Sequence, residues 1–462
     1  MQAHMKKSSP HISPLMRQLS TYIAGALKKP LPKDVEEKAR HLVLDTLAAM
    51  VSGSRLHPGQ FAISYVKSLG RSNKEACIAG TKLMTCAVDA ALANGMLAHA
   101  DETDDSHGIA RMHPACSIVP AALAMAEREG RSGKHMLRAV VLGYDIGCRL
   151  TFALGATPAW HAGISTHGFG GTFGSAVAAG ALAGLDARQM RYLLSYAAQQ
   201  ASGSSCLVRD SEHIEKAFDL GGMPARNGVT AATMVAHGFT GLEDVFAGER
   251  NFLSTYEVEG NPRALLHELG KRYEIMNTNV KKWSVGSPAQ APLDSLLALI
   301  KTHGLKAGDL RKMVVRVDER GAKITDNNAM PDINMQNLLA VMLIDGGLTF
   351  ADCHDASRMR RPVVRRIKSL IELIPSPELN NVKPPRQGIV EFTTRDGRHL
   401  KHRTYAVRGT GDNPMTRAEI EDKSADLLAP VLGARRTRAL IDTVWKLERV
   451  ADMRSLRPLL SA

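Results

Sequence analysis

Aromatic residues are scarce in this chain of 462 residues, since phenylalanine, tryptophan and tyrosine together make up only 5% of it. Hydrophobic residues nevertheless amount to 44%, so the core has to be built mainly from alanine, aliphatic residues and methionine. Small apolar side chains favour close packing between helices. Single-stranded nucleic acids are commonly bound by aromatic side chains that stack on the bases, and the scarcity of aromatic residues argues against that class of protein.

Cysteine is also sparse, and its spacing excludes common structural roles. The six cysteines form no CxxC pair and show none of the spacings of a zinc site. Scattered cysteines in a long chain are typical of free thiols in a reducing compartment. The N-terminal residues contain no continuous apolar segment like that of a signal peptide, and no apolar run is long enough to cross a bilayer. We therefore expect a cytoplasmic protein with no membrane partner.

Positive charge predominates, because 59 lysines and arginines outnumber 46 acidic residues and give a formal charge of +13. The basic residues are dispersed except for one dense run, RMRRPVVRRIK, at 358–368. Such a balance fits a nucleic-acid binder, an enzyme for multiply charged anions, or a solvated basic face. Because few aromatic side chains are interleaved with the run, we interpret it as a solvated basic face and expect no nucleic-acid partner.

Apolar residues recur with the spacing of three and four that is typical of helices through roughly the first half of the chain. One predicted helix covers 86–106, and another, rich in glycine and alanine, covers 171–186. The pattern then changes. RKMVVRVDE at 311–319 predicts a strand, and 388–407 predicts a β-hairpin with a turn at its Asp-Gly pair.

The chain is therefore predicted to be mainly α, with a large all-helical domain and a smaller α+β domain. The α+β domain is expected to contain a helix at 354–372. Helical periodicity returns after the hairpin, so the C-terminal helices are expected to pack back on the helical domain. The predicted boundaries are 10–269 for the helical domain, 270–410 for the α+β domain and 411–462 for the C-terminal helices.

The densest group of ionisable residues is AHADETDDSHGIARMHP at 98–114. A helix that continues through 86–106 would place four of its residues on one face, namely His99, Glu102, Thr103 and Ser106. An acidic helix end exposed to solvent would explain the same residues without any functional site. The density of these groups beside an alanine-rich stripe favours a site for acid–base chemistry.

His113 follows this predicted helix and precedes Pro114. Proline disfavours helical angles at the residue before it, so we expect His113 in a loop between two packed helices, where catalytic side chains are common. Metal binding is an alternative, because imidazoles and carboxylates are both frequent ligands. The possible ligands are His99, Asp101, Asp105, His107 and His113. No HExxH pair is present, and we expect no bound metal.

Two further stretches carry candidate residues. GFGGTFG at 168–174 lacks the GxGxxG spacing of a dinucleotide loop and follows no strand, so we interpret its small residues as a surface for close helix packing. His167 is expected just before this helix, where the helix N-terminus favours anions. In EHIEKAFDLGGMPARNG at 212–228, the ammonium of Lys216 precedes a predicted helix and suits a carboxylate, although isolated lysines usually lie on the surface.

Taken together, these stretches resemble the MmgE/PrpD family over roughly 13–450. The anchors are HADETDDSH with the following HP, GGTFG to GLD at 171–186, GGMPARNG at 221–228, LIDGG at 343–347 and GTGDNPMTRAEIEDK at 409–423. The resemblance implies a helical domain completed by the C-terminus, a smaller α+β lid domain and a homodimer. It also implies a small di- or tricarboxylate as substrate and no cofactor, because family members generally work without an iron–sulfur cluster.

The resemblance implies roles for several residues in 98–114. Glu102 and Ser106 match the acidic and hydroxyl residues of the family motif, where aspartate and threonine are usual, and His113 matches its HP histidine. We expect His113 to act as acid or base and Glu102 to orient or polarise a histidine. Ser106 and His107 are expected to shape the pocket and hydrogen-bond the substrate.

Other matches lie farther along the chain. His167 matches the histidine before the family's glycine-rich helix and is expected to supply the second acid or base. Lys216 and Lys281 match two family lysines and are expected to bind carboxylates and to stabilise negative charge in the transition state. Three further residues are expected to contact the substrate: Ser287, Gln290 and Asn337.

Two positions depart from the decarboxylases of the family. Gly286 stands where they carry a histidine, and Asn337 stands where they carry a tyrosine, so two groups with a useful pKa are missing. We therefore predict a cofactor-independent hydro-lyase of the 2-methylcitrate dehydratase type. An isomerase or epimerase and a decarboxylase of a related polycarboxylate are alternatives within the family. A metal-dependent hydro-lyase and a non-enzymatic nucleic-acid binder are alternatives outside that reading.

Overall fold

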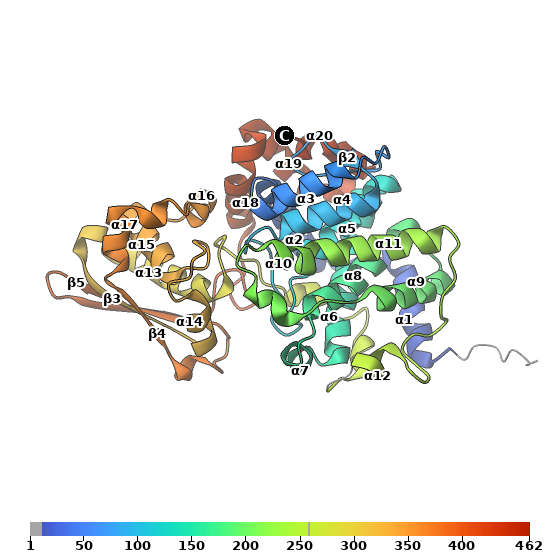
Figure 1. Ribbon diagram of the computed structural model, residues 1–462, viewed down its shortest axis with the longest axis horizontal. Coiled ribbons are helices and arrows are strands. Elements are labelled where there is room, and N and C mark those ends of the chain that lie inside the picture. The colour runs from blue at the N-terminus through green and yellow to red at the C-terminus, as the bar shows by residue number, and fades with distance from the viewer. Residues whose placement is uncertain (1–11, 257–258) are drawn as a thin grey trace, which may run out of the picture. The chain divides into compact units, whose positions relative to one another are not determined.

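The computed structural model describes residues 12–256 and 259–462, and helices predominate in it (Figure 1). The fold is mainly α with a smaller α+β part, as the sequence predicts. Contacts divide the chain into two compact units, which we call the helical unit and the α+β unit. The helical unit comprises the chain up to Ala100, Asp105–Thr278 and Leu428–Ala462. The α+β unit comprises Asp101–Asp104 and Asn279–Leu427.

The helical unit is built almost entirely from helices, and its C-terminal segment packs on the helices α2 and α5. Its longer helices are α1 (Pro14–Gly25), α2 (Lys33–Gly53), α3 (His57–Ser68), α4 (Ala87–Ala98), α5 (Ala115–Arg128), α6 (Gly133–Leu154), α8 (Thr166–Ala183), α9 (Ala187–Gln200), α11 (Met223–Ala236) and α19 (Ala434–Val444). The shorter elements are β1 (Ala76–Cys77), β2 (Met84–Thr85), α7 (Ala156–His161), α10 (Ile214–Ala217), α12 (Phe252–Tyr256) and α20 (Arg457–Leu460). Among the described helices, none combines the length and the apolar character of a membrane-spanning segment.

Helix α8 packs against α5, α6 and α11, and nearly all of its residues are buried. Its glycines permit the contact with α6. A Cβ atom on Gly174 would lie 2.7 Å from the carbonyl oxygen of Gly143, and one on Gly147 would lie 2.7 Å from that of Gly170. Only glycine allows two backbones to approach so closely. This confirms the interpretation of the glycine-rich stretch as a packing surface.

The α+β unit contains a four-stranded sheet in the order β4-β3-β5-β6, in which β3 pairs with β4 in parallel and the other pairs are antiparallel. Leucine and methionine side chains of α13 and α15 pack on the buried side chains of β3 and β5 to form its core. The strands are β3 (Leu310–Val317), β4 (Ile371–Pro375), β5 (Gly388–Thr394) and β6 (His399–Thr404). The helices are α13 (Gln290–His303), α14 (Glu319–Thr325), α15 (Met335–Asp345), α16 (Phe350–His354), α17 (Pro362–Lys368) and α18 (Arg417–Leu432), the last of which continues into the helical unit.

The predicted strand and hairpin of this unit are confirmed, but the helix predicted over 354–372 was wrong at both ends. Arg361 has extended angles, as expected for a residue before proline, and α17 starts only at Pro362. At the other end, Ile371 begins β4, which pairs with β3. Sheet pairing across the unit therefore overrides the local helical pattern.

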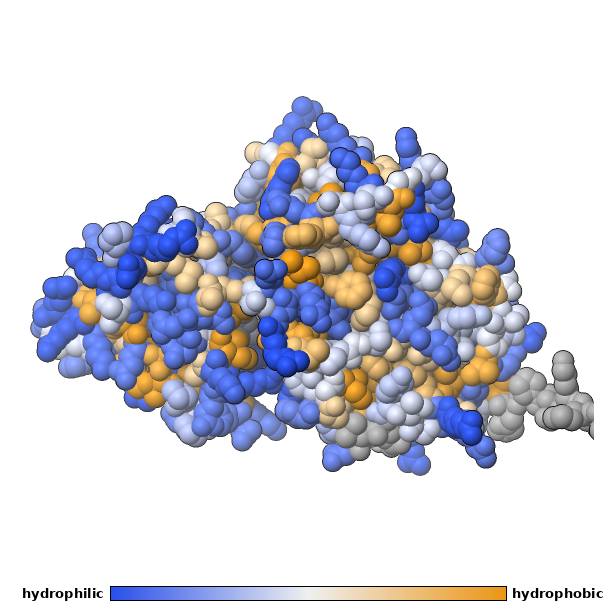
Figure 2. Space-filling view, in the orientation of Figure 1, coloured by the Kyte–Doolittle hydropathy of each residue, from blue (hydrophilic) through white to orange (hydrophobic). Residues whose placement is uncertain are grey.

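Helix α17 carries part of the dense basic run. The side chains of Arg360, Arg361, Arg365 and Arg366 are exposed, and hydrophilic residues gather over this helix in Figure 2. Val364 and Ile367, on the opposite face, are buried. The run is therefore the solvated face of an amphipathic helix, as interpreted from the sequence.

Candidate functional site

Helix α4 ends at Ala98, so the helix predicted over 86–106 was wrong in its second half. The carboxylate of Asp101 accepts hydrogen bonds from the backbone N–H of Thr103 at 3.0 Å and from its hydroxyl at 2.5 Å. Side chains that bond to nearby backbone in this way compete with helix formation. The polar residues of this segment therefore do not share one helical face, and distant parts of the chain decide where each of them lies.

Asp105 anchors the start of α5. Its carboxylate accepts the backbone N–H of Ala115 at 3.1 Å and the hydroxyl of Tyr144 at 2.7 Å. A carboxylate at this position is favoured by the positive end of the helix dipole. Because Ala115 directly follows the His113-Pro114 pair, Asp105 fixes the backbone beside His113. The prediction that His113 lies in a loop before a helix is confirmed.

His107 holds the loop that leads to His113. Its Nδ1 atom accepts the N–H of Ala110 at 3.1 Å, so the ring proton lies on Nε2, which is 3.3 Å from Glu274 Oε2. Burial raises the pKa of Glu274, but its bonds with His107, Arg272 and other partners outweigh burial and lower the pKa to about 2. Both ring nitrogens of His107 are thus engaged within the helical unit.

Four histidines form a cluster in the helical unit, which we call the histidine cluster: His99, His113, His167 and His213. The ring centroid of His99 lies 5.1 Å from that of His113 and 5.0 Å from that of His213. The centroids of His113 and His167 are 5.3 Å apart, and the backbone N–H of His113 donates to Nδ1 of His167 at 3.1 Å. His99 and His213 are buried, whereas His113 and His167 are half-buried. The cluster therefore has two inner imidazoles and two that reach toward solvent.

Each imidazole comes from the end of a different element. His99 is the C-cap of α4, and His113 lies before α5. His167 lies in the first turn of α8, so the expectation that it precedes the helix was wrong. The helix starts earlier than predicted because the side chain of Ser165 accepts the N–H of Gly168 and caps it.

His213 reaches the cluster through a strained backbone. It precedes α10 with a φ of 62°, in the left-handed region that non-glycine residues rarely adopt. A single turn of π-helix at Phe218–Gly222 follows α10, and such turns are frequent at functional sites. Lys216 lies within α10, with a half-buried side chain and a backbone N–H that donates to Asp210 Oδ2 at 2.9 Å.

The π-helical turn places the carboxyl group of Asp219 under the start of α8. Ser165 donates its hydroxyl to Asp219 Oδ2 at 2.5 Å. The carboxyl group also lies close to Gly203, where an added Cβ would be 2.3 Å from Oδ1. Burial and the nearby Glu215 raise the pKa of Asp219 to about 7, against the lowering effect of the Ser165 bond. Asp219 can therefore exchange a proton near neutral pH, like an imidazole.

The α+β unit contains a second buried group, which we call the lysine–carboxylate cluster: Lys281, Glu102 and Asp104. Lys281 Nζ donates to the carbonyl oxygen of Glu102 at 2.7 Å and lies 3.3 Å from its Oε2. The distance from Nζ to Asp104 Oδ1 is 3.8 Å. All three side chains are buried. A substrate carboxylate at Lys281 would therefore compete with two acidic side chains for one ammonium group.

Two further titratable residues accompany Asp101 in this unit. His354 Nε2 lies 2.8 Å from Asp101 Oδ2. Burial alone lowers the pKa of His354, but Asp101 outweighs it and raises the pKa to about 9. Burial raises the pKa of Asp332 to about 6, with contributions from nearby acidic residues and against the lowering effect of His354. The pair of Asp101 and His354 is therefore charged at neutral pH.

The remaining sequence candidates differ in whether their polar atoms already form hydrogen bonds within the protein. Gln290 bonds through its amide to the backbone of Trp283 and Val285. Asn337 is buried, and neither atom of its amide has a hydrogen-bond partner among the described residues. Ser106 is buried in the helical unit, and its hydroxyl likewise has no partner in the described part of the chain. Ser287 is half-buried.

The structure thus brings His113 together with His167, and Glu102 together with Lys281. It also adds four residues that were not among the sequence candidates: His213, Asp219, Asp332 and His354. His213 and Asp219 lie close to Lys216 in the sequence, within 212–228, so the sequence of that stretch could have indicated them. No local pattern marks the other two, because their partners come from distant segments.

Two family models match the chain, the MmgE/PrpD N-terminal domain over residues 17–264 and the MmgE/PrpD C-terminal domain over residues 283–448. The chain therefore belongs to the MmgE/PrpD family. Among its relatives, a cis-aconitate decarboxylase-like protein of Aspergillus oryzae is 24% identical over 96% of this chain and 96% of its own. Human cis-aconitate decarboxylase is 24% identical over 96% and 94%, and cis-aconitate decarboxylase of Aspergillus terreus is 23% identical over 93% and 92%.

Proposed function

We propose that this protein is a lyase that decarboxylates a small unsaturated polycarboxylate of the cis-aconitate kind, without a cofactor. The observation that carries the proposal is the histidine cluster. It supplies two buried and two half-buried imidazoles, all of which can transfer protons. The relatives named above support decarboxylation over the 2-methylcitrate dehydration expected from the sequence, because three of them that match nearly the whole chain bear the name of that reaction.

The chemistry requires a proton donor more than a nucleophile. When the bond between carbon and the departing carboxylate breaks, its electron pair stays on the carbon skeleton, and a proton has to be delivered to carbon. Imidazoles suit this step because their ordinary pKa lies near neutral pH. In the proposal, His113 or His167 delivers the proton, and His99 and His213 fix their orientation from within the unit. Lys216 is proposed to bind a remaining carboxylate.

The hydro-lyase is the second candidate, favoured by a specific observation in the α+β unit. Gly286 and Asn337 replace the histidine and tyrosine that the family's decarboxylases carry, and the nearest atoms to an added Cβ on Gly286 are 3.8 Å away, on Ile333. Dehydration instead removes a proton from carbon and delivers one to the hydroxyl group, which leaves as water, so it needs proton-transfer groups of the same kind. The two reactions therefore differ in their products and not in the first residues to test.

The test is NMR of reaction mixtures that contain the purified protein with cis-aconitate, citrate or 2-methylcitrate. Decarboxylation gives new vinylic signals from cis-aconitate together with carbon dioxide, whereas dehydration gives new vinylic signals only from the hydroxy acids. Exchange with deuterated water and no change of skeleton would indicate an isomerase or epimerase. A chelator should leave the rate unchanged, and a loss restored by one metal ion would contradict the cofactor-independent part of the proposal.

We expect His113→Ala to lower kcat by about 10²- to 10⁴-fold, because it removes a proton-transfer group, while the protein stays folded. His237→Ala is the matched control, since His237 is an exposed histidine at the end of α11 in the same unit. Equal rates for the two variants would overturn the role of the cluster. If none of the acids is turned over and none raises the Tm of the protein, the polycarboxylate proposal itself fails.

A further inference from the structure

The α+β unit carries a groove of about 380 Å³ that none of the residues discussed above lines. It lies between α13, the edge strand β6 and the loop that follows β6. Its lining residues are Lys282, Asp294, Leu297, Ala298, Lys301, His402, Arg403, Thr404, Tyr405, Ala406, Arg408 and Asn413. Four of these are lysine or arginine and one is acidic, so the groove is basic.

Two of the four cations are already neutralised by acidic partners. Lys282 Nζ lies 3.3 Å from Asp294 Oδ1, and its ammonium also lies 4.5 Å from the centre of the Trp283 ring. The guanidinium of Arg408 is bound by both oxygens of Glu419, at 2.9 and 2.5 Å. These pairs build the wall of the groove and contribute little net charge to it.

Arg403 is held in a different way, by neutral groups. Its Nε and one terminal nitrogen donate to the amide oxygen of Gln387 at 2.9 and 2.7 Å. Its guanidinium also lies 4.7 Å from the centre of the Tyr405 ring. In the described part of the chain, no carboxylate forms an ion pair with Arg403. The arginine is therefore fixed in orientation while its charge remains uncompensated, which lowers the entropic cost of binding an anion.

Lys301 adds a second uncompensated charge. It lies in the last turn of α13 with an exposed side chain, and among the described residues no acidic group lies within ion-pair distance of it. His402 supplies a further nitrogen at the same groove. One cavity is thus lined by three side chains that can donate hydrogen bonds, Arg403, Lys301 and His402. The positive charges of Arg403 and Lys301 have no acidic partner there in the part of the chain that the structure describes.

We propose that this groove binds a small, multiply charged anion with phosphate or carboxylate groups, at a site separate from the histidine cluster. Arginine matches such groups because its planar fork can donate two parallel hydrogen bonds. The volume of the groove suits an anion of the size of pyrophosphate or citrate and excludes a folded macromolecule. The proposal does not depend on the reaction that the protein catalyses.

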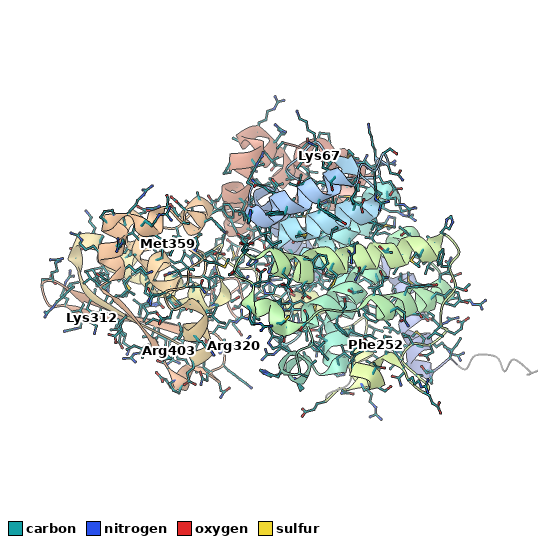
Figure 3. The ribbon with its side chains drawn as sticks, viewed as in Figure 1. Lys67, Phe252, Lys312, Arg320, Met359 and Arg403 are labelled. Atoms are coloured by element: carbon teal, nitrogen blue, oxygen red, sulfur yellow. The ribbon has the colours of Figure 1, made fainter. Side chains whose placement is uncertain are left out.

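The test is isothermal titration calorimetry of the full chain with pyrophosphate in one arm and citrate in the other, at low salt. We expect at least one of the two to bind, and its Kd to rise tenfold or more in Arg403→Gln. Arg320→Gln is the matched control. Arg320 is an exposed arginine of α14 in the same unit, and its substitution removes the same charge. Figure 3 labels both arginines. Lys301→Gln should weaken binding of the same anion.

Three outcomes would overturn the proposal. One is that neither anion binds at millimolar concentration. Another is that Arg403→Gln and Arg320→Gln weaken binding equally, which would indicate a diffuse effect of surface charge. The third is that binding is lost in His113→Ala but kept in Arg403→Gln, which would assign the anion to the histidine cluster. Circular dichroism and the Tm of each variant establish that it is folded.

Discussion

In the helical unit, imidazoles lie against one another with ring centroids 5.0 to 5.3 Å apart. In the α+β unit, three buried carboxylates face a lysine and a protonated histidine. Imidazoles can gain or lose a proton near neutral pH at little cost. A buried ion pair, in contrast, resists any change in its charge, because removal of one partner leaves the other uncompensated in a medium of low dielectric constant.

This difference suggests a division of labour between the two clusters. The histidine cluster is suited to proton transfer because imidazole is the side chain that ordinarily ionises near neutral pH. Asp219 is suited to it because burial raises its pKa to about 7. The lysine–carboxylate cluster and the Asp101–His354 pair are suited to holding a fixed arrangement. Variants of each cluster should therefore respond differently to charge removal and to pH, and three stability measurements test this.

The largest effect is expected for Lys281→Met. The change removes the ammonium that faces Glu102 and Asp104 and leaves two buried carboxylates near each other, which we expect to lower the free energy of unfolding by about 3–5 kcal/mol. Lys282→Met is the matched control. Its ammonium pairs with Asp294 at a partly exposed position, so its loss should cost less than about 1 kcal/mol. Urea unfolding followed by tryptophan fluorescence measures both, and equal losses would contradict the distinction.

The Asp101–His354 pair should make the free energy of unfolding fall at alkaline pH. The folded pKa of His354 is raised from 6.5 to about 9, so its contribution is fully present below the ordinary pKa and is lost as the pH rises through 9. The shift corresponds to roughly 3 kcal/mol. Between pH 6 and pH 10, the wild-type protein should therefore lose stability that His354→Gln does not lose. His303→Gln, an exposed histidine of the same unit, should follow the wild-type curve.

Asp219 should make the stability of the helical unit fall over a lower pH range. Because burial raises its pKa from 3.8 to about 7, the folded state binds a proton more tightly than the unfolded state, and stability falls as the pH rises from 4 to 7. Asp219→Asn keeps an oxygen that accepts the Ser165 hydroxyl and cannot ionise. We expect it to be more stable than wild type by about 4 kcal/mol at pH 8 and nearly equal to it at pH 4. Thermal unfolding at the two pH values measures this, and an equal difference at both would exclude the raised pKa.

Much of the fold was predictable because it depends on local patterns. Spacings of three and four residues predicted that the first half of the chain is helical, and the hairpin at 388–407 followed from alternation and an Asp-Gly turn. The packing role of the glycines in 168–174 was also predictable, since only small residues allow two helices to approach closely. In each case, the information lies within one or two elements.

The site residues were predictable in kind but not in arrangement. The amino acids of 98–114 indicate a group of ionisable side chains, and the order of the motifs that resemble the family indicates membership of it. The helix expected through 106 nevertheless ends at Ala98, because Asp101 bonds to Thr103 and His354 and Glu102 bonds to Lys281. Buried charges require partners, and those partners come from segments far away in the sequence.

The amino-acid sequence thus determined many of the helices, the sheet hairpin, the family and the concentration of ionisable residues in 98–114. Only the tertiary structure decided which imidazoles meet, because His213 and His167 join His99 and His113 from separate elements through packing and a strained backbone angle. It also raised the pKa values of Asp219 and His354. The proton affinity of a side chain depends on burial and on its neighbours in space, and neither is written in the residues next to it along the chain.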